Sequence, residues 1–228
     1  TVSNTPGVLT DATADLTLTL MLMLCRRAGE GERELRAGEW SGWRPKHLVG
    51  RQMTGKTLGI IGMGRIGRAV AHRAHFGFGM EIVFQNRSPV DDGAGVGGRQ
   101  LASVAEVCAA SDFVSLHCAA TPETRHILGW DALAAMSPSA YVINTARGDV
   151  VDEDALVTAL ESGGIGGAGL DVFQGEPRVS PAIMAAPNTV LLPHLGSATE
   201  ETRVAMGMKV VENARAFAMG EALPDKVG

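Results

Sequence analysis

The stretch from 58 to 85 constrains the fold most, because it joins two short apolar runs through a glycine-rich turn and a helical pattern. LGIIG (58–62) and EIVFQ (81–85) have the length and composition of buried strands, and RIGRAVAHRAHFGFG (65–79) has the spacing of an amphipathic helix. The apolar face of this helix consists of Ile66, Ala69, Val70 and Ala74. We expect Gly77 to end the helix. A strand, a helix and a strand in this order predict a β-α-β unit.

The turn GMGRIG (62–67) matches the pattern G-x-G-x-x-G, which joins strand to helix in dinucleotide-binding folds. Gly62 would form the tight turn, Gly64 would let the backbone approach a pyrophosphate, and Gly67 would let the helix pack closely on the strand. The pattern is weak by itself, but here it stands between a predicted strand and a predicted helix. The sequence therefore predicts a dinucleotide site.

A second phosphate signature, GRQMTGKT (50–57), matches the nucleoside-triphosphate P-loop directly before the first strand. A P-loop needs a strand before it and a helix after it, so that backbone N–H groups converge on phosphate. Here the order is inverted, because the polar stretch WSGWRPKHLV precedes the match and a strand follows it. Lys56 is thus expected in a turn that leads into a strand, and we interpret this match as a coincidence.

The rest of the chain continues the alternation of strands and helices. A capping box from Ser103 to Glu106 predicts a helix through Ala110, and Ser197 with Glu200 would cap a long helix from Ala198 to Met219. Further strands are expected at 112–118, 140–146, 168–173 and 189–193, and helical segments at 121–128, 131–136 and 152–163. This alternation predicts an α/β fold with a doubly wound parallel sheet, a Rossmann-like dinucleotide-binding domain. Its ligands should lie at the carboxyl ends of the strands.

The run LTLTLMLML (16–24) alternates like a strand, but its surroundings favour a helix. Asp11 and Asp15 precede it, Arg26 and Arg27 follow it, and Leu and Met are strong helix formers. A helix that is apolar on nearly every side must be buried on nearly every side. We therefore expect a helix packed between subunits.

Charge and cysteine content exclude several classes of partner. The net charge is −5, with acids and bases interspersed, which argues against nucleic acid and anionic membranes. The three cysteines are widely spaced, as expected for a reduced intracellular protein, and no signal peptide or membrane-spanning run is present, so we expect a cytoplasmic protein. His72 and His75 have no third ligand at metal spacing, so no metal site is predicted. A catalytic pair of His117 and Cys118 is disfavoured because strand alternation points them apart.

Five segments occur in an order that resembles the D-isomer-specific 2-hydroxyacid dehydrogenases: NTPGVLTDATADL, the glycine turn, NTARGDVVDEDAL, LDVFQGEP and LPHLGSAT. GEWSGWRP followed by GRQMTGKTLGIIG most resembles the glyoxylate/hydroxypyruvate reductase branch. The resemblance implies that 1–9 is a remnant of a substrate domain or its hinge, that 10–220 is the dinucleotide-binding domain with a dimerisation helix and arm, and that 221–228 is a tail toward the substrate domain. It also implies a homodimer and a fragment that lacks the N-terminal substrate domain.

Three residues could carry the reduction of a 2-oxo acid. Arg147 follows a predicted strand and could bind a carboxylate through two hydrogen bonds. His194 stands before a predicted helix, and histidine is the residue type most often used as a general acid–base near neutral pH. Glu176 could bond its far ring nitrogen. Taken singly, Arg147 could be a surface charge, Glu176 a turn residue before Pro177, and His194 a polar group beside a helix. The resemblance assigns the three residues to the catalytic site.

The resemblance also implies the residues that bind the cofactor. It assigns the segment through Ala119 to the cofactor pocket mainly through its backbone, and it places Asp171 near the nicotinamide, although a capping or core-network role for Asp171 is nearly as plausible. The full expected set is Gly62, Gly64, Arg65, Ile66, Gly67, Asn86, Arg87, Ser88, Ala119, Pro122, Thr145, Ala146, Asp171, Gly196 and Ser197.

The end of the second strand favours NADP(H) over NAD(H). NAD-specific folds place an acid there to bond the ribose hydroxyls, whereas this chain has Gln85, Asn86, Arg87 and Ser88. A 2′-phosphate would find a guanidinium and two small polar donors there. A polar loop without a ligand role is the alternative, because Asp91 and Asp92 follow closely.

The predicted function is therefore hydride transfer from NADPH to a small 2-oxo acid, with glyoxylate and hydroxypyruvate as the leading substrates. Phosphoglycerate-type dehydrogenase is the alternative enzyme. A corepressor-like dinucleotide sensor is a second alternative, since such a protein can retain Arg147, Glu176 and His194, and a non-catalytic cofactor-binding module is a third. We expect the 228-residue chain to bind dinucleotide and to turn over 2-oxo acids hardly at all.

Overall fold

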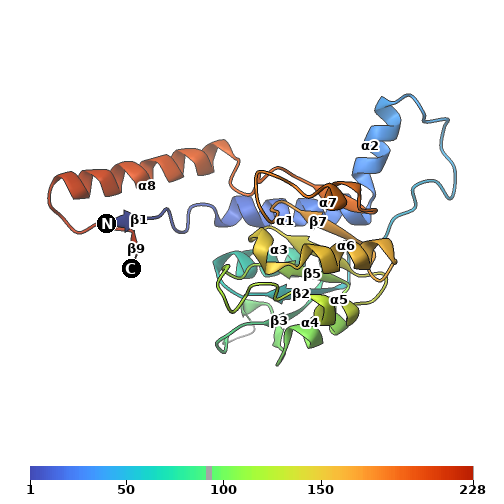
Figure 1. Ribbon diagram of the computed structural model, residues 1–228, viewed down its shortest axis with the longest axis horizontal. Helices are drawn as coiled ribbons and strands as arrows, with labels where there is room; N and C mark the ends of the chain where they lie inside the picture. Colours follow the sequence, from blue (N-terminus) through green and yellow to red (C-terminus); the bar gives the residue numbers. More distant parts are fainter. Residues whose placement is uncertain (91–93, 228) are drawn as a thin grey trace.

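The centre of the molecule is a seven-stranded parallel sheet (Figure 1). A computed structural model describes residues 1–90 and 94–227. The strands lie in the order β4 (Arg99–Gln100), β3 (Glu81–Gln85), β2 (Thr57–Ile61), β5 (Phe113–Leu116), β6 (Tyr141–Asn144), β7 (Gly167–Leu170) and β8 (Thr189–Leu191). The order reverses between β2 and β5, where ligands bind in doubly wound sheets. The predicted fold class is confirmed.

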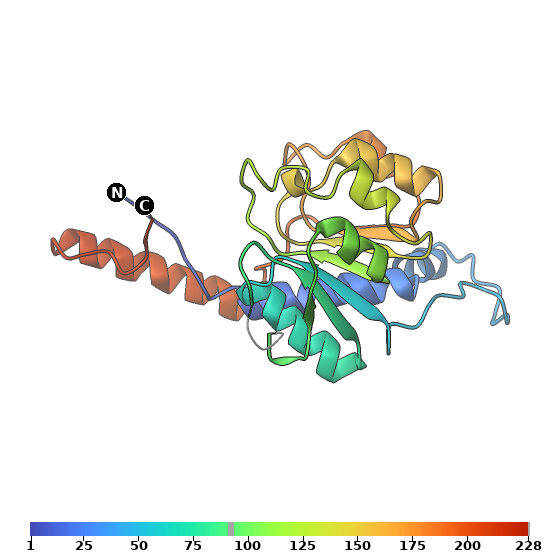
Figure 2. The ribbon, with the colours of Figure 1, turned by 90° about the horizontal axis from the view of Figure 1, so that it is seen from below.

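Helices cover both faces of the sheet (Figure 2). On one face, α1 (Thr10–Cys25) and α3 (Arg65–Phe78) pack over a cluster that includes Ile60 and Ile143. On the other face, α4 (Val104–Ala110), α5 (Trp130–Ala134) and α6 (Glu153–Glu161) pack over a cluster that includes Val114 and Val142. The chain therefore has two hydrophobic cores with the sheet between them. No helix within the described residues has the length and hydrophobicity to cross a bilayer.

The alternating Leu/Thr run forms α1, so the helix prediction is correct. Leu20 and Met21 are completely buried, and α1 packs against α3 and the last strands of its own chain. Arg73 of α3 also pairs with two carboxylates of α1, Asp11 at 2.9 Å and Asp15 at 2.7 Å. The protein's own sheet and α3 thus account for the apolar composition of α1, which by itself is no evidence of a position between subunits.

Two predicted helix boundaries are wrong, and one predicted helical segment is not helical. The helix α3 continues through Gly77 to Phe78, because the residue with the left-handed conformation that ends a helix is Gly79, at φ 60°. The segment 121–128 forms hydrogen-bonded turns without a helix. The helix α8 (Glu200–Ala218) is capped by Thr199, whose hydroxyl accepts from the Thr202 N–H, and Ser197 lies before the cap.

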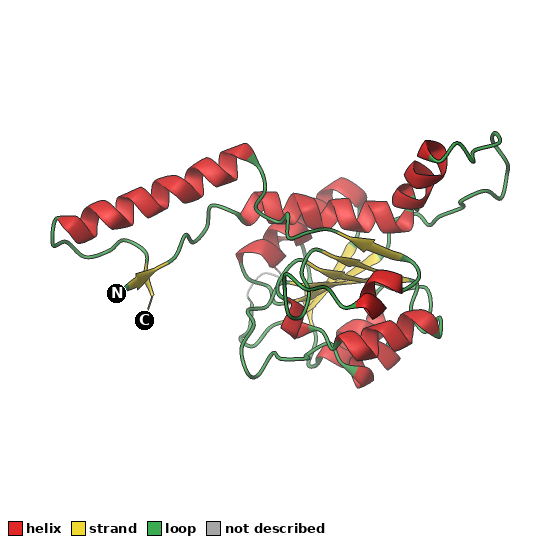
Figure 3. Ribbon diagram, turned by 45° about the horizontal axis from the view of Figure 1, so that its top comes forward, coloured by secondary structure: helices red, strands yellow, loops and turns green. Residues whose placement is uncertain are grey.

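Two segments project from the body on opposite sides (Figures 1 and 3). On one side are α2 (Ala28–Arg36) and the loop that follows it, and on the other is α8. Beyond α8, β1 (Val2–Ser3) pairs antiparallel with β9 (Lys226–Val227), so both ends of the chain lie together. A short helix, α7 (Pro181–Ala185), precedes β8.

Candidate active site

The candidate site residues lie at one edge of the sheet, because each follows the carboxyl end of a parallel strand. Gly62 follows β2, Asn86 follows β3, and Ala119 comes shortly after β5. Three further strands contribute the segments around Thr145 (after β6), Asp171 (after β7) and His194 (after β8). The fold therefore brings together segments that are far apart in the sequence.

The glycine turn has the geometry of a phosphate cradle. Gly62 has φ 98°, and a Cβ at this residue would lie 2.6 Å from the Cys118 nitrogen. A Cβ at Gly67 would lie 2.3 Å from the Gly62 carbonyl oxygen, so the helix and the turn are in direct backbone contact. Around Gly64, by contrast, the space for a Cβ is empty. Arg65 and Ile66 open α3, whose first turn has no side-chain cap, so its N–H groups are free to face an anion.

The loop after β3 presents Arg87 and Ser88 to solvent, but it uses Asn86 internally. Asn86 Oδ1 accepts from the Met63 N–H at 3.1 Å, and Asn86 Nδ2 donates to the Ser88 carbonyl at 3.0 Å. Asn86 Oδ1 thus supports the glycine turn, and one of the two hydrogens on Nδ2 has an acceptor within the loop. Arg87 is exposed and has no ion pair with another described residue. Asp91 and Asp92, the basis of the alternative interpretation of this loop, lie outside the described residues.

His194 and Glu176 form a hydrogen-bonded pair, with His194 Nδ1 2.8 Å from Glu176 Oε2. The other oxygen of Glu176 accepts from the Phe173 N–H at 2.8 Å, so both carboxylate oxygens are engaged. Burial tends to raise the pKa of Glu176, but the His194 and Phe173 hydrogen bonds and the charges of His194 and Arg147 outweigh it and leave that pKa lowered. The carboxylate is therefore ionised at neutral pH, and no residue within 1–90 and 94–227 forms a hydrogen bond or ion pair with Nε2 of the imidazole.

Asp171 positions the turn that carries His194. Its carbonyl accepts from the His194 N–H, and its two carboxylate oxygens accept from the N–H groups of Leu195 and Gly196 at 2.6 and 2.8 Å. His194 has φ 57°, a conformation that non-glycine residues rarely adopt. Burial raises the pKa of Asp171, although the two N–H bonds oppose that rise. These contacts favour the network role of Asp171.

Arg147 is exposed on a turn that Asn144 shapes. Asn144 accepts from the Ala146 N–H and donates to the Arg147 carbonyl, as short polar side chains do in such turns. The next residue, Gly148, lies against the Glu176 loop so closely that a Cβ would be 2.0 Å from the Phe173 carbonyl carbon. The turn of Arg147 and the loop of Glu176 are thus in backbone contact.

Two threonines of α1 brace the site and were missed by sequence reasoning. Thr13 Oγ1 donates to the Gly196 carbonyl at 3.0 Å, and Thr17 Oγ1 lies 2.9 Å from Thr145 Oγ1, both in buried positions. The sequence does place two threonine hydroxyls four residues apart, on one face of a helix, which indicates a shared polar contact. Only the fold shows which residues they contact. The other expected cofactor residues, Ala119, Pro122, Ala146 and Ser197, lie at the same sheet edge.

The rejected motifs have structural roles. Lys56 lies in a turn before β2, with its Nζ 3.5 Å from Asp112 Oδ1. His117 Nε2 lies 2.8 Å from Ser115 Oγ, and burial lowers the pKa of His117 to about 3. Burial also raises the pKa of the neighbouring Cys118 thiol, so neither side chain is suited to nucleophilic catalysis.

A family model for the D-isomer-specific 2-hydroxyacid dehydrogenases, NAD-binding domain, matches residues 18–196. The chain belongs to this family.

Similar proteins include dehydrogenases and reductases of several sources. A glyoxylate reductase from Thermococcus litoralis is 47% identical over 99% of this chain and 69% of its own length. The structure of an NADPH-dependent glyoxylate/hydroxypyruvate reductase from Sinorhizobium meliloti, in complex with NADP and malonate, is 41% identical, with a TM-score of 0.91 over 99% of this chain and 70% of its own. A D-mandelate dehydrogenase from Rhodotorula graminis is 32% identical, with a TM-score of 0.90 over 99% and 68%.

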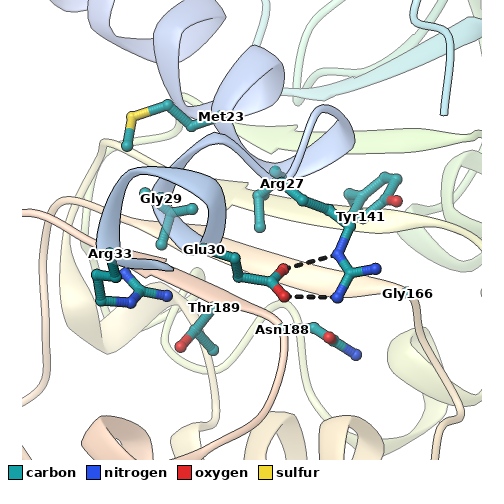
Figure 4. A pocket seen from close by; sticks show the side chains of 11 residues that line it. Met23, Arg27, Gly29, Glu30, Arg33, Tyr141, Gly166, Asn188 and Thr189 are labelled. Atoms are coloured by element: carbon teal, nitrogen blue, oxygen red, sulfur yellow. Dashed lines mark hydrogen bonds and ion pairs between the residues drawn. The ribbon is translucent and has the colours of Figure 1, made fainter. Parts of the chain in front are cut away.

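This dehydrogenase also has a cavity of about 250 Å³ at the opposite edge of the sheet (Figure 4). Arg27 and Glu30 line it and pair through two hydrogen bonds of 2.9 and 2.5 Å, and Tyr141 and Thr189 line it from the amino ends of β6 and β8. The cavity lies at the amino ends of the strands, whereas the glycine turn lies at their carboxyl ends, so the cavity is separate from the candidate active site.

Proposed function

We propose that this dehydrogenase reduces a small 2-oxo acid to the 2-hydroxy acid with NADPH. The observation that carries the proposal is the Glu176–His194 pair at 2.8 Å, which lies at the same sheet edge as Arg147 and the glycine turn. An acid–base group, a cation for a carboxylate and a phosphate cradle are the parts that this reaction needs.

The residues present fit such a cofactor, because the space beside Gly64 is open and the first turn of α3 has free N–H groups. NADPH, when bound, supplies the hydride. Glu176 accepts a hydrogen bond from the Nδ1–H group of His194, so Nε2 is the atom that gives a proton to the carbonyl oxygen. Arg147 binds the substrate carboxylate, whose charge its guanidinium neutralises. Asp171 keeps the His194 turn in place during the proton transfer.

The substrate class is tested with a panel of 2-oxo acids. The relatives named glyoxylate reductase and glyoxylate/hydroxypyruvate reductase support glyoxylate and hydroxypyruvate as substrates. The D-mandelate dehydrogenase shows that a chain of this fold can act on an aromatic acid, so the panel includes phenylglyoxylate. NADPH and NADH oxidation by the natural full-length protein is measured with each acid. Cofactor binding without turnover of any acid would instead support the dinucleotide-sensor alternative.

Replacing Arg87 with alanine should weaken NADPH binding tenfold or more and change NADH binding less than about twofold. Only NADPH carries the 2′-phosphate, and one charge-assisted hydrogen bond is worth about 1.5–3 kcal/mol. Both cofactors are titrated by fluorescence into the wild type, the variant and a control, Arg36→Ala, which removes an exposed arginine paired with Glu32 on α2. Equal losses for the two cofactors would refute the preference for NADPH.

We also propose that the protein is a homodimer in which a second copy covers the arm, which consists of α2 and the loop that follows it. Trp43 is 82% exposed and Trp40 is 54% exposed, and Leu35 and Val49 of the same segment are exposed as well. Large aromatic residues are enriched in interface cores. The protein should sediment as a dimer at micromolar concentration, and Trp40→Ser with Trp43→Ser should shift it to monomer. Trp130→Ser, at a 55% exposed tryptophan on α5, should leave it dimeric, and a monomeric wild type would contradict the proposal.

A further inference from the structure

Gln174 connects the loop that carries Glu176 to two other segments of the chain. Its backbone N–H donates to Glu153 Oε1 at 2.6 Å. Its side-chain nitrogen donates to the Val151 carbonyl at 3.0 Å and lies 2.7 Å from His126 Nε2. Both hydrogens of the amide therefore have an acceptor, and the loop is tied to the 126 segment and to the start of α6.

The segments that Gln174 joins are themselves fixed. The His126 N–H donates to the Asp149 carbonyl at 2.8 Å, and the Leu128 N–H donates to the Val150 carbonyl at 3.1 Å. Glu153 is 8% exposed and is the first residue of α6. Gln174 thus ties a surface loop to segments that have hydrogen bonds of their own to the rest of the domain.

The anchored loop controls two groups of the candidate site. Phe173 N–H holds one oxygen of Glu176, which leaves the other directed at His194. The Phe173–Gln174 peptide also supports Gly148, which follows Arg147, through the contact that leaves no room for a Cβ. The Gly148 contact involves only backbone atoms of Phe173 and Gln174, so loss of the Gln174 side-chain hydrogen bonds should mainly move the Glu176 carboxylate relative to the imidazole of His194.

We propose that Gln174 is a positioning residue of the active site, which acts through Glu176 to fix the orientation of His194, with His126 as its outer support. This inference rests on the proposed function, because the orientation of His194 matters for proton transfer. Small misplacements of a catalytic group are costly, and 1 Å can lower a rate about a hundredfold.

The test uses Gln174→Leu, which removes both side-chain donors at similar volume, alone and combined with Glu176→Gln. His126→Asn is a second variant, because asparagine tolerates the left-handed backbone of His126 (φ 54°) and is too short to reach Gln174. The control is Gln52→Leu, the same substitution at an exposed glutamine outside the site. Thermal unfolding confirms that each variant is folded.

The kinetics use the 2-oxo acid that the panel identifies as the substrate. Gln174→Leu should lower kcat about ten- to a hundredfold and change KM and NADPH binding less than about twofold. Its pH–rate profile should shift in the same direction as that of Glu176→Gln, since in both the carboxylate no longer stabilises the protonated imidazole of His194. In the Glu176→Gln background the extra loss should be less than about twofold, because a residue that acts through Glu176 has nothing left to position. His126→Asn should have a smaller effect in the same direction.

A second readout separates failure of this inference from failure of the proposed function. Nitrogen-15 NMR of the imidazoles reports which nitrogen of His194 carries the proton, and it needs no turnover. The Nδ1–H form should dominate in the wild type and in Gln52→Leu, and it should lose population in Gln174→Leu. An unchanged His194 signal and pH profile in Gln174→Leu would overturn the positioning role, as would equal losses of kcat in both backgrounds. A protein without turnover that still shows the NMR change would overturn the proposed function alone.

Discussion

Replacing His194 with glutamine should lower kcat for 2-oxo acid reduction by about 10²–10⁴-fold and leave NADPH binding within about twofold. Loss of a general acid typically costs that factor. His194 lies on the turn after β8, whereas the proposed pyrophosphate cradle is the turn after β2, so the variant should remove the proposed proton donor without touching that cradle. The measurements are steady-state kinetics and cofactor titration on the same preparation.

Two further variants make this result specific. Glu176→Gln should also lower kcat, but less than His194→Gln, because the imidazole stays present and loses only its charged partner. His72→Gln, at an exposed histidine of α3, should leave kcat unchanged. If His194→Gln retains a tenth or more of the wild-type kcat, His194 is not the general acid.

Gly64→Val and Gly67→Val should separate cofactor binding from folding. The space for a Cβ at Gly64 is empty and its φ is −80°, so the variant should unfold within about 2 °C of the wild type. The same side chain would occupy the place where a pyrophosphate approaches the turn, so NADPH binding should weaken tenfold or more, at about 1.4 kcal/mol per factor of ten.

At Gly67, by contrast, we expect the substitution to lower the stability of the fold. A Cβ would lie 2.3 Å from the Gly62 carbonyl oxygen, so helix and turn must move apart. Such overpacking costs about 1–3 kcal/mol, and each kcal/mol lowers Tm by roughly 2–4 °C in a chain of this size. Gly77→Val, which also has open space but lies at the far end of α3, is the control and should bind NADPH normally. If Gly64→Val bound NADPH like the wild type, the cradle would lie elsewhere.

The parts of the fold that the sequence predicted correctly are those encoded locally. The glycine turn has its strand before it and its helix after it in one continuous stretch, so its context could be checked without a structure. The end of α3 was misplaced by two residues because Gly77 and Gly79 are both plausible stops, and only the backbone angle of Gly79 distinguishes them. The cap of α8 was misplaced for a similar reason, since Ser197 and Thr199 are both good cap residues.

The parts that sequence reasoning missed depend on contacts between distant segments. Gln174 and His126 are 48 positions apart, and Thr13 and Gly196 are 183 apart, so no spacing rule connects them. Asn86 was predicted as a donor to the cofactor, and sequence reasoning gave no sign that its side-chain oxygen also accepts from the Met63 N–H of the glycine turn. Arg147, Glu176 and His194 were predicted from their order in family segments, and the structure brings Glu176 and His194 into contact.

The pairing of β1 with β9 joins both ends of the chain to the far end of α8, so these ends should move together with the helix. Lys209 and Asn213 of α8 both donate to Asp225, at 2.9–3.1 Å, so the paired ends of the chain are fastened to the outer half of this helix. A helix of 19 residues is about 28 Å long, and a tilt of about 10° at its base would displace its tip by roughly 5 Å. The helix is capped by Thr199, five positions after His194, so such a tilt would be centred close to the proposed proton donor.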